Sequence, residues 1–417
     1  MFQLYQDSMA IACFCHRIDF FSTMTANPKW KEITQELLPG QSASDRPDLV
    51  TRVFQMKKQA LLKDITKNGI LGLTIAHIHT IEFQKRGLPH MYLLIVLDPN
   101  SRLHTPEDVD EIICAEFPDE TLDPELHAFV LQFMTHGPCN ARCKDSTTGQ
   151  CTKGFPKRFR ESTILNENSY VSYHRRNDGR KFKCSARPDA FEYENCHVVP
   201  YSRYLLLKYE CHINIECCMS IKSVKYIHKY IYKSSDRATI EEQHRQNEVQ
   251  KYIDARYVSA SEAIWRILRF KMHAEVPSVT RLQVHLENEQ NVLIQVGVDN
   301  NATVLNRALN RNTTLTAYFQ ACASDANARQ YLYQEFPQHY RWLSKTSKWA
   351  IRKNKIFSLG RMYFVPPKAG ELFHLRTLLT VVHGPTSFQD LQTFNGVNCE
   401  TYHAACIARG LLEDDGE

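Results

Sequence analysis

Several features typical of membrane, secreted and motor proteins are missing from this sequence. No apolar run approaches the ~20 residues that a membrane-spanning helix needs. The first fifteen residues have no basic start followed by an apolar core, so we expect no secretory signal. The pattern G-x-x-x-x-G-K-[ST] does not occur, which excludes a recognisable P-loop motor within these 417 residues. Internal repeats and low-complexity tracts are also lacking.

What is present is the composition of an ordinary globular protein. Hydrophobic residues make up 43% and charged residues 23%, so extensive disorder is not expected. A chain of 417 residues predicts two or three domains. The fourteen cysteines lack the regular spacing of a secreted disulfide framework. We therefore expect reduced thiols in a cytosolic or nuclear protein, some of them bound to metal.

Residues 81–97 have the pattern of a β-hairpin, with a Gly-Leu-Pro turn between two apolar-rich runs. Because strand side chains alternate between faces, His90 and Tyr92 point to one side, as do Glu82 and Gln84 on the preceding strand. The end of the hairpin is almost continuously apolar, which predicts a central strand covered on both sides. Polar side chains on buried strands need partners, and a bound cation would supply them.

The segment 141–187 is strongly basic. It holds twelve Lys or Arg against four acids, a net charge of +8 in a chain whose total is +5. Aromatic residues are interleaved with these charges, which suits a phosphate backbone with bases stacked on rings. A solvated basic surface is an equally good interpretation of the charge alone. The DNA contacts that we predict here are Lys153, Lys157, Arg158, Arg160, Arg175 and Arg176.

A Cys/His pattern overlaps the start of this segment. His136, Cys139, Cys143 and Cys151 have the spacing H-x2-C-x3-C-x7-C in a loop-rich stretch. One imidazole and three thiolates could bind Zn²⁺, and a small loop region without a core would gain folding energy from the metal. The spacing matches no standard zinc finger, and scattered free thiols are the alternative.

Residues 224–233 fit a helix better than a strand. Lys225 and Lys229 lie four residues apart, as do Tyr226 and Tyr230, so the two phenols share one face. A Tyr/Ile stripe at helical spacing is commonly part of a core. The neighbouring lysines favour a functional interpretation, because a phenol near cationic groups can attack phosphorus.

Taken together, six blocks of sequence resemble successive parts of the Helitron transposase Rep-like region, often called the Helitron helicase-like domain. They are FSTMTANPKW (21–30), EFQKRGLPHMY (82–92), HGPC (136–139), VPY (199–201), HINIE (212–216) and KYIHKY (225–230). Residues 256–266 and 391–412 resemble the continuation of that region toward its helicase. The resemblance covers nearly the whole chain, and the hairpin block is its most specific part.

This resemblance implies a rolling-circle nuclease of the paired-histidine (HUH), two-tyrosine type that acts on single-stranded DNA at transposon ends. By that resemblance His90 is the first ligand of Mg²⁺ or Mn²⁺, and Tyr226 and Tyr230 are the catalytic nucleophiles. The third ligand is Glu82 or Gln84, a choice that rests on strand facing. Lys225 and Lys229 beside the tyrosines are expected to contact the DNA.

One position departs from the family pattern, which has His where this chain has Tyr92. A neutral phenol with a pKa near ~10 is a much poorer metal ligand than an imidazole at neutral pH. We therefore expect weak or absent nicking. Three functions remain open: an impaired nuclease and strand transferase, a non-catalytic DNA-binding remnant of a transposon protein, and a structural interaction domain.

The fold class that we expect is α+β. An antiparallel sheet of the HUH type should carry the hairpin and a strand at 212–217, with helices on one side and the tyrosine helix across the site. Residues 1–235 would form the Rep-like nuclease domain, with a Cys/basic insertion at about 136–190. Residues 236–417 would be mostly helical and link toward a helicase that these residues do not contain, so a separate helicase is one candidate partner. We expect the protein in the nucleus.

Overall fold

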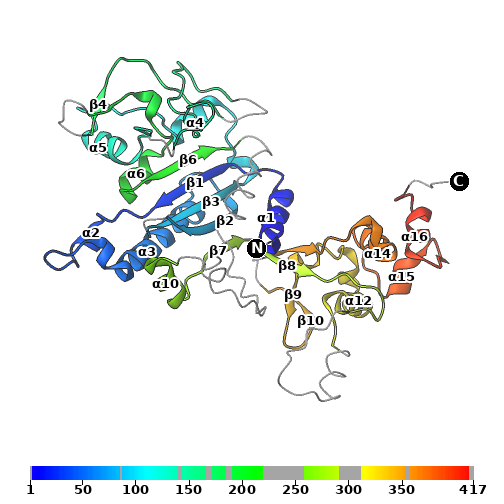
Figure 1. Cartoon of the computed structure of the whole chain (residues 1–417). Helices are drawn as coiled ribbons and strands as arrows, with labels where there is room; N and C mark the ends of the chain where they lie inside the picture. The colour runs from blue at the N-terminus through cyan, green and yellow to red at the C-terminus, as the bar shows by residue number, and fades with distance from the viewer. Residues whose placement is uncertain are drawn as a thin grey trace. The chain divides into compact units, whose positions relative to one another are not determined.

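The computed structural model describes residues 2–84, 87–139, 143–165, 171–184, 190–218, 258–290, 311–353 and 357–412. It divides the chain into two compact units, Met1–Val276 and Pro277–Glu417 (Figure 1). The first unit extends beyond the boundary expected near residue 235, because strand β7 (His273–Val276) pairs with β2 (Thr74–Phe83). None of the described helices has the length and apolar character needed to cross a membrane.

A five-stranded sheet organises the first unit. Its strand order is β6-β1-β3-β2-β7, and every neighbouring pair is antiparallel. The strands not yet given are β1 (Phe20–Thr25), β3 (Pro89–Leu97) and β6 (Ile213–Cys217). The hairpin predicted from the sequence is β2–β3, and β3 is the middle strand, as its apolar run indicated. Gly87 has φ +81° in the turn, a conformation that favours glycine.

Helices cover the apolar face of this sheet. The longest is α3 (Pro47–Thr66), which begins with a proline at its first turn and buries Phe54 and Leu61 in the core that also contains Met91 and Leu93 of β3. Helix α10 (Ala260–Ile267) packs against α3 and buries Trp265. Full burial of each such side chain stabilises the fold by about 1.5–3 kcal/mol.

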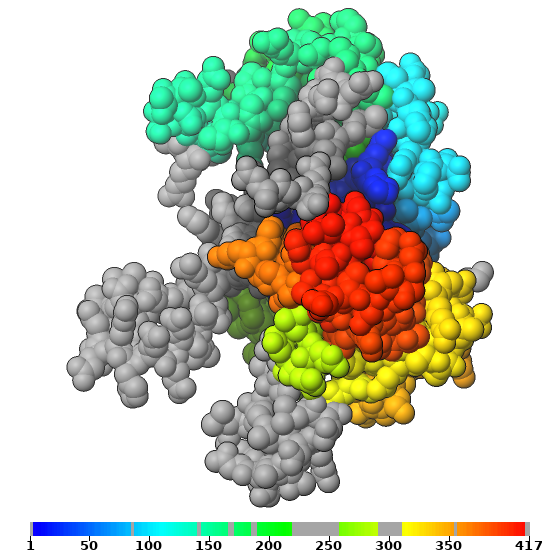
Figure 2. Space-filling model, turned by 90° about the vertical axis from the view of Figure 1, so that its right-hand side faces the viewer, coloured from blue at the N-terminus to red at the C-terminus, as the bar shows by residue number. Residues whose placement is uncertain are grey.

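The remaining elements of the first unit surround the sheet. The helices are α1 (Phe2–Cys15), α2 (Lys31–Thr34), α4 (Pro106–Ile112), α5 (Pro124–Phe133), α6 (Arg203–Tyr209), η1 (Ala43–Asp45), η2 (Pro99–Ser101) and η3 (Asn195–His197), and two short strands are β4 (Phe182–Lys183) and β5 (Glu192–Tyr193). The segment between α5 and α6 contains the Cys/His pattern and the basic residues. It gathers at one end of the unit, in green-cyan, in the space-filling view (Figure 2).

The second unit has its own core. Tyr318, Tyr333 and Phe336 are fully buried, and the Tyr333 hydroxyl is 2.7 Å from the Thr314 hydroxyl. Its elements are β8 (Ser278–Leu282), α12 (Thr314–Ser324), η6 (Ala326–Gln330), α13 (Phe336–His339), β9 (Tyr340–Leu343), β10 (Lys348–Ile351), β11 (Ser358–Met362), η7 (Pro367–Ala369), α14 (Glu371–Leu378), α15 (Phe388–Gln392), β12 (Thr393–Phe394), β13 (Val397–Asn398) and α16 (Tyr402–Ala408).

The sequence predicted the class of fold correctly: the chain mixes helices and strands and has a central antiparallel sheet. A mostly helical C-terminal part was expected, whereas the second unit combines short helices with two-stranded sheets. Strands β8 and β11 pair in parallel although eighty residues separate Ser278 from Ser358, a pairing that local patterns do not reveal. The expected tyrosine helix at 224–233 lies outside the described residues.

Candidate functional site

The face of the sheet opposite α3 is polar where β1, β3 and β2 lie side by side. In the register of these strands His90 stands between Thr25 and Glu82, and Tyr92 pairs with Thr23 in the next row. Cross-strand partners share a face, so these side chains form two adjacent polar rows. We call this surface the polar face.

His90 is held in a defined orientation on this face. Its side chain is 8% exposed, and its Nδ1 lies 2.7 Å from the Thr25 hydroxyl oxygen. Burial, with smaller contributions from the charges of His212 and Lys153, lowers the pKa of His90 to about 3. The ring is therefore neutral at physiological pH, which is the form that binds metal. When Nδ1–H donates to Thr25, Nε2 carries the lone pair that a metal would need.

The register distinguishes the two candidates for the third ligand. Glu82 is directly opposite His90 within the β2–β3 ladder and is half-buried. Gln84 is exposed beyond the end of β2, where its backbone N–H donates to the carbonyl of Leu88 in the turn. Glu82 is thus the candidate that forms a cross-strand pair with His90.

Tyr92 occupies the position where the family pattern has histidine. Its ring packs edge-on against the His90 ring, with centroids 4.6 Å apart, and stacks on Phe21 at 6.2 Å. The described residues contain one group of three His, Cys, Asp or Glu side chains close enough to share a metal ion. That group does not lie on the polar face. The polar face therefore fits a divalent cation only in part, through His90 and Glu82.

Strand β6 extends the polar face beyond β1. The Thr23 hydroxyl donates to Asn214 Oδ1 over 2.7 Å, and Glu216 stands opposite Phe21. Asn214 and Glu216 lie two residues apart within β6, so their side chains share this face. His212 precedes the strand, and its Nδ1 lies 2.7 Å from the carbonyl oxygen of Phe133.

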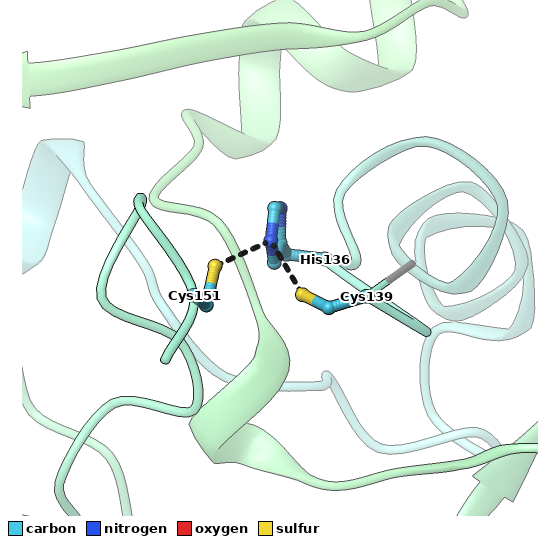
Figure 3. Close-up of side chains that lie close together, drawn as sticks. All are labelled: His136, Cys139 and Cys151. Atoms are coloured by element: carbon cyan, nitrogen blue, oxygen red, sulfur yellow. Dashed lines mark hydrogen bonds between the residues drawn. The ribbon is translucent and has the colours of Figure 1, made fainter. Parts of the chain in front are cut away.

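The three side chains that can share a metal are His136, Cys139 and Cys151, whose ligand atoms all lie within 4.8 Å of one another (Figure 3). His136 Nε2 is 3.2 Å from the sulfur of Cys151 and 3.4 Å from that of Cys139. The predicted fourth member, Cys143, is half-buried and interacts with Cys139. We call these four residues the Cys/His cluster. The arrangement is compatible with a structural metal.

Thiolate charge is favoured unequally within the cluster. Burial raises the pKa of Cys139, and the neighbouring thiols of Cys151 and Cys143 raise it further. Burial also acts to raise the pKa of Cys151, but backbone N–H groups, including that of Lys153 at 3.3 Å from the sulfur, outweigh burial and lower it. Cys151 is thus the residue prepared to bind metal as a thiolate.

The predicted DNA-contacting residues differ in their surroundings. Lys153 and Arg158 are exposed, while Lys157 and Arg160 are half-buried. Arg176 is exposed but forms an ion pair with Glu116, with nitrogen and oxygen 2.6 Å apart.

Arg175 is the exception among them. It is 3% exposed and donates to the carbonyl groups of Ala115, Asn195 and Val198 at 3.0, 2.8 and 2.6 Å. Its guanidinium joins Ala115 to the segment 195–198 inside the protein, so we leave it out of the DNA-contacting set.

Two parts of the predicted site lie outside the described residues. These are the nucleophiles Tyr226 and Tyr230 and the adjacent Lys225 and Lys229. Sequence reasoning in turn missed Thr25 as the partner of His90. The pair depends on the register between β1 and β3, sixty-five residues apart, and the only local signal is that Thr25 ends an alternating strand.

Comparison with known families finds a match that includes most of the β2–β3 hairpin. Residues 1–95 match the family model described as the Helitron helicase-like domain at the N-terminus. The match runs from α1 into β3 and includes His90 and Tyr92, whereas the Cys/His cluster lies beyond it. A search of curated proteins finds no match. The N-terminal part of this chain is therefore similar to a Helitron helicase-like domain over residues 1–95.

Proposed function

We propose that the first unit is the single-strand DNA-processing region of a transposon protein, built as a HUH-type nickase and strand transferase with a weakened metal centre. The observation that carries this proposal is the row His90–Glu82 on the polar face, with Tyr92 in the adjoining row. The family match to residues 1–95 supports it. The substrate would be single-stranded DNA at transposon ends, in the nucleus, with unwinding supplied by a separate helicase.

The residues of the chain would divide the reaction between them. A Mg²⁺ or Mn²⁺ ion, when bound, would supply polarisation of the scissile phosphate. His90 and Glu82 would hold that ion, with the His90 ring fixed by Thr25. The phenol oxygen of Tyr226 or Tyr230 would form a bond to phosphorus, and the bond to the leaving DNA oxygen would break. One DNA end would then be linked to tyrosine and the other would carry a free hydroxyl, which takes the proton.

Tyr92 determines how much of this activity is retained. A neutral phenol binds divalent metals poorly, so a site with one imidazole and one carboxylate should bind the ion weakly. We expect slow nicking that is detectable with Mn²⁺ at high concentration. The Cys/His cluster would bind a different metal: its mixed nitrogen and sulfur donors favour Zn²⁺.

The test is covalent trapping of labelled single-stranded DNA by the full chain, with and without Mn²⁺. We expect a low yield of a protein–DNA adduct, which requires the metal and disappears in the double variant Tyr226→Phe, Tyr230→Phe. Absence of any adduct, both from the natural chain and from a Tyr92→His variant that folds normally, would refute the proposed nickase.

A second function is favoured by the incomplete donor set around His90. A non-catalytic DNA-binding remnant would retain the sheet and the basic segment without holding Mg²⁺ or Mn²⁺. Such a protein would bind single-stranded DNA with a steep salt dependence and form no adduct, even as Tyr92→His. A structural interaction domain would show neither property.

A further inference from the structure

The loop of residues 151–157 connects the Cys/His cluster to the polar face. It turns sharply after Cys151: the Gly154 N–H donates to the Cys151 carbonyl over 2.8 Å, and the Lys153 N–H points at the Cys151 sulfur. Gly154 has φ +67°, a conformation that favours glycine. A turn whose amides face a cysteine sulfur stabilises the thiolate and directs it toward a metal.

Side chains of the loop are also stacked on the cluster. The Phe155 ring lies on the His136 ring, with centroids 4.5 Å apart and planes inclined by 25°. The Lys157 ammonium lies over the Phe155 ring, 4.8 Å from its centre, and donates to the Lys153 carbonyl over 3.1 Å. The Lys157 ammonium is thus linked through Phe155 to the imidazole that would bind the metal, while the Lys157 backbone N–H donates to the Cys196 carbonyl over 2.8 Å.

The two lysines of the loop lie within electrostatic range of the polar face. Lys153 is exposed, and its charge acts on both His90 and His136. Lys157 interacts with Glu216, the acid that ends the polar face on β6. Two cations beside a row of polar strand residues provide a binding place for one phosphate group.

Backbone hydrogen bonds fix the base of the loop to the sheet. The N–H of His136 donates to the carbonyl of His197 over 2.9 Å, and Val199 N–H donates to Met134 over 2.7 Å. The chain then continues to Pro200, whose carbonyl accepts from Ile215 N–H in β6 over 3.2 Å. His136 is thus attached to the edge of the sheet, whereas the loop itself contributes no fully buried apolar side chain.

We propose that a zinc ion on His136, Cys139, Cys143 and Cys151 holds this loop in place, so that Lys153 and Lys157 bind a phosphate of the single strand beside His90. The proposal rests on the proposed function in one respect, the passage of the DNA strand over the polar face. Zinc would position the loop and take no part in the cleavage chemistry. Its removal would release both lysines from the polar face.

Zinc content tests the first half of the proposal. The full chain purified without added metal should contain about one zinc per molecule. Cys151→Ser and Cys139→Ser should lose it, while Cys13→Ser, an exposed cysteine in α1, should keep it. A metal-free natural chain that also fails to take up added Zn²⁺ overturns the proposal.

Binding of single-stranded DNA over a series of salt concentrations tests the second half. Each phosphate contact from a lysine contributes about 0.7 to the slope of log affinity against log salt. Lys153→Ala, Lys157→Ala should therefore keep its zinc and lower the slope by about 1.4. Lys63→Ala, an exposed lysine of α3 on the other side of the sheet, should leave the slope unchanged.

The critical variant is Cys151→Ser, whose slope should fall by the same amount as that of the double-lysine variant. A Cys151→Ser chain without zinc that retains the natural slope overturns the proposal, as does a double-lysine variant with unchanged binding. The natural chain with chelated zinc gives the same comparison without a substitution, should Cys151→Ser fail to fold. An absent covalent adduct refutes the nickase alone, because zinc content and salt slope do not depend on cleavage.

Discussion

The polar face and the Cys/His cluster are two candidate metal sites built in opposite ways. On the polar face, ladder hydrogen bonds between β1, β3 and β2 set the positions of His90, Glu82 and Tyr92 whether or not a metal is bound. In the cluster, His136 and Cys151 come from a loop region with little core of its own. A sheet can therefore preserve the geometry of a site after a ligand has been replaced, whereas a loop cluster depends on its ligands for its geometry.

Metal removal should produce the largest effect and should separate the two regions. Structural zinc in finger peptides contributes about 10–16 kcal/mol of apparent binding free energy, so its loss should unfold the loop around Cys151. A chelator should make the thiols of Cys139, Cys143 and Cys151 reactive and expose the loop to proteases, while the sheet keeps its circular dichroism signal. Equal thiol reactivity before and after chelation would contradict a metal-dependent loop.

Arg175 offers a test of the scaffold between the two regions. Arg175→Met leaves the carbonyl groups of Ala115, Asn195 and Val198 without their donor, at about 1 kcal/mol each, so unfolding in urea should show a loss of about 3 kcal/mol. The exposed Arg158→Met should cost less than about 0.5 kcal/mol.

For DNA binding, we expect Arg158→Met to have the larger effect and Arg175→Met the smaller one. Arg158→Met should lower the salt slope by about 0.7, and folded Arg175→Met should leave the slope unchanged. A loss of DNA contacts in Arg175→Met without loss of stability would return Arg175 to the binding surface.

Tyr92→His should turn the partly fitting polar face into a complete one. An imidazole replaces a phenol on a strand whose register already places it beside His90, so Mn²⁺ should bind at least about 10-fold more tightly. Calorimetric titration with Mn²⁺ measures the gain, and the adduct yield should rise with it. Tyr92→Phe is the matched control, with no gain expected. If the natural chain and Tyr92→His bind Mn²⁺ equally, the phenol is not the weak point of the site.

Strand alternation predicted the polar face well, because Glu82, His90 and Tyr92 belong to one local hairpin. The cluster was visible only as a spacing of Cys and His, since nothing local shows that Cys151 folds back onto His136. The burial of Arg175 could not be predicted, because its three acceptors come from segments that only the tertiary fold brings together. Charge composition alone makes Arg175 equivalent to Arg158, although one stabilises the interior and the other faces solvent.

The smallest effect should come from the hydroxyl that orients His90. Thr25→Val keeps the shape of the side chain but leaves His90 Nδ1 without its 2.7 Å partner, at a stability cost of about 1 kcal/mol. Thr23→Val is a matched control, because it loses a hydrogen bond of the same length, to Asn214, in the neighbouring row.

Measured in the natural chain, where residue 92 is Tyr, Mn²⁺ affinity should fall about 10-fold for Thr25→Val and remain unchanged for Thr23→Val, although both lose similar stability. An equal fall in both variants would mean that the face as a whole, rather than the Thr25 hydroxyl, sets the orientation of the imidazole. A fall confined to Thr25→Val would show that the scaffold still holds the first ligand ready, and that the replaced second ligand limits the site.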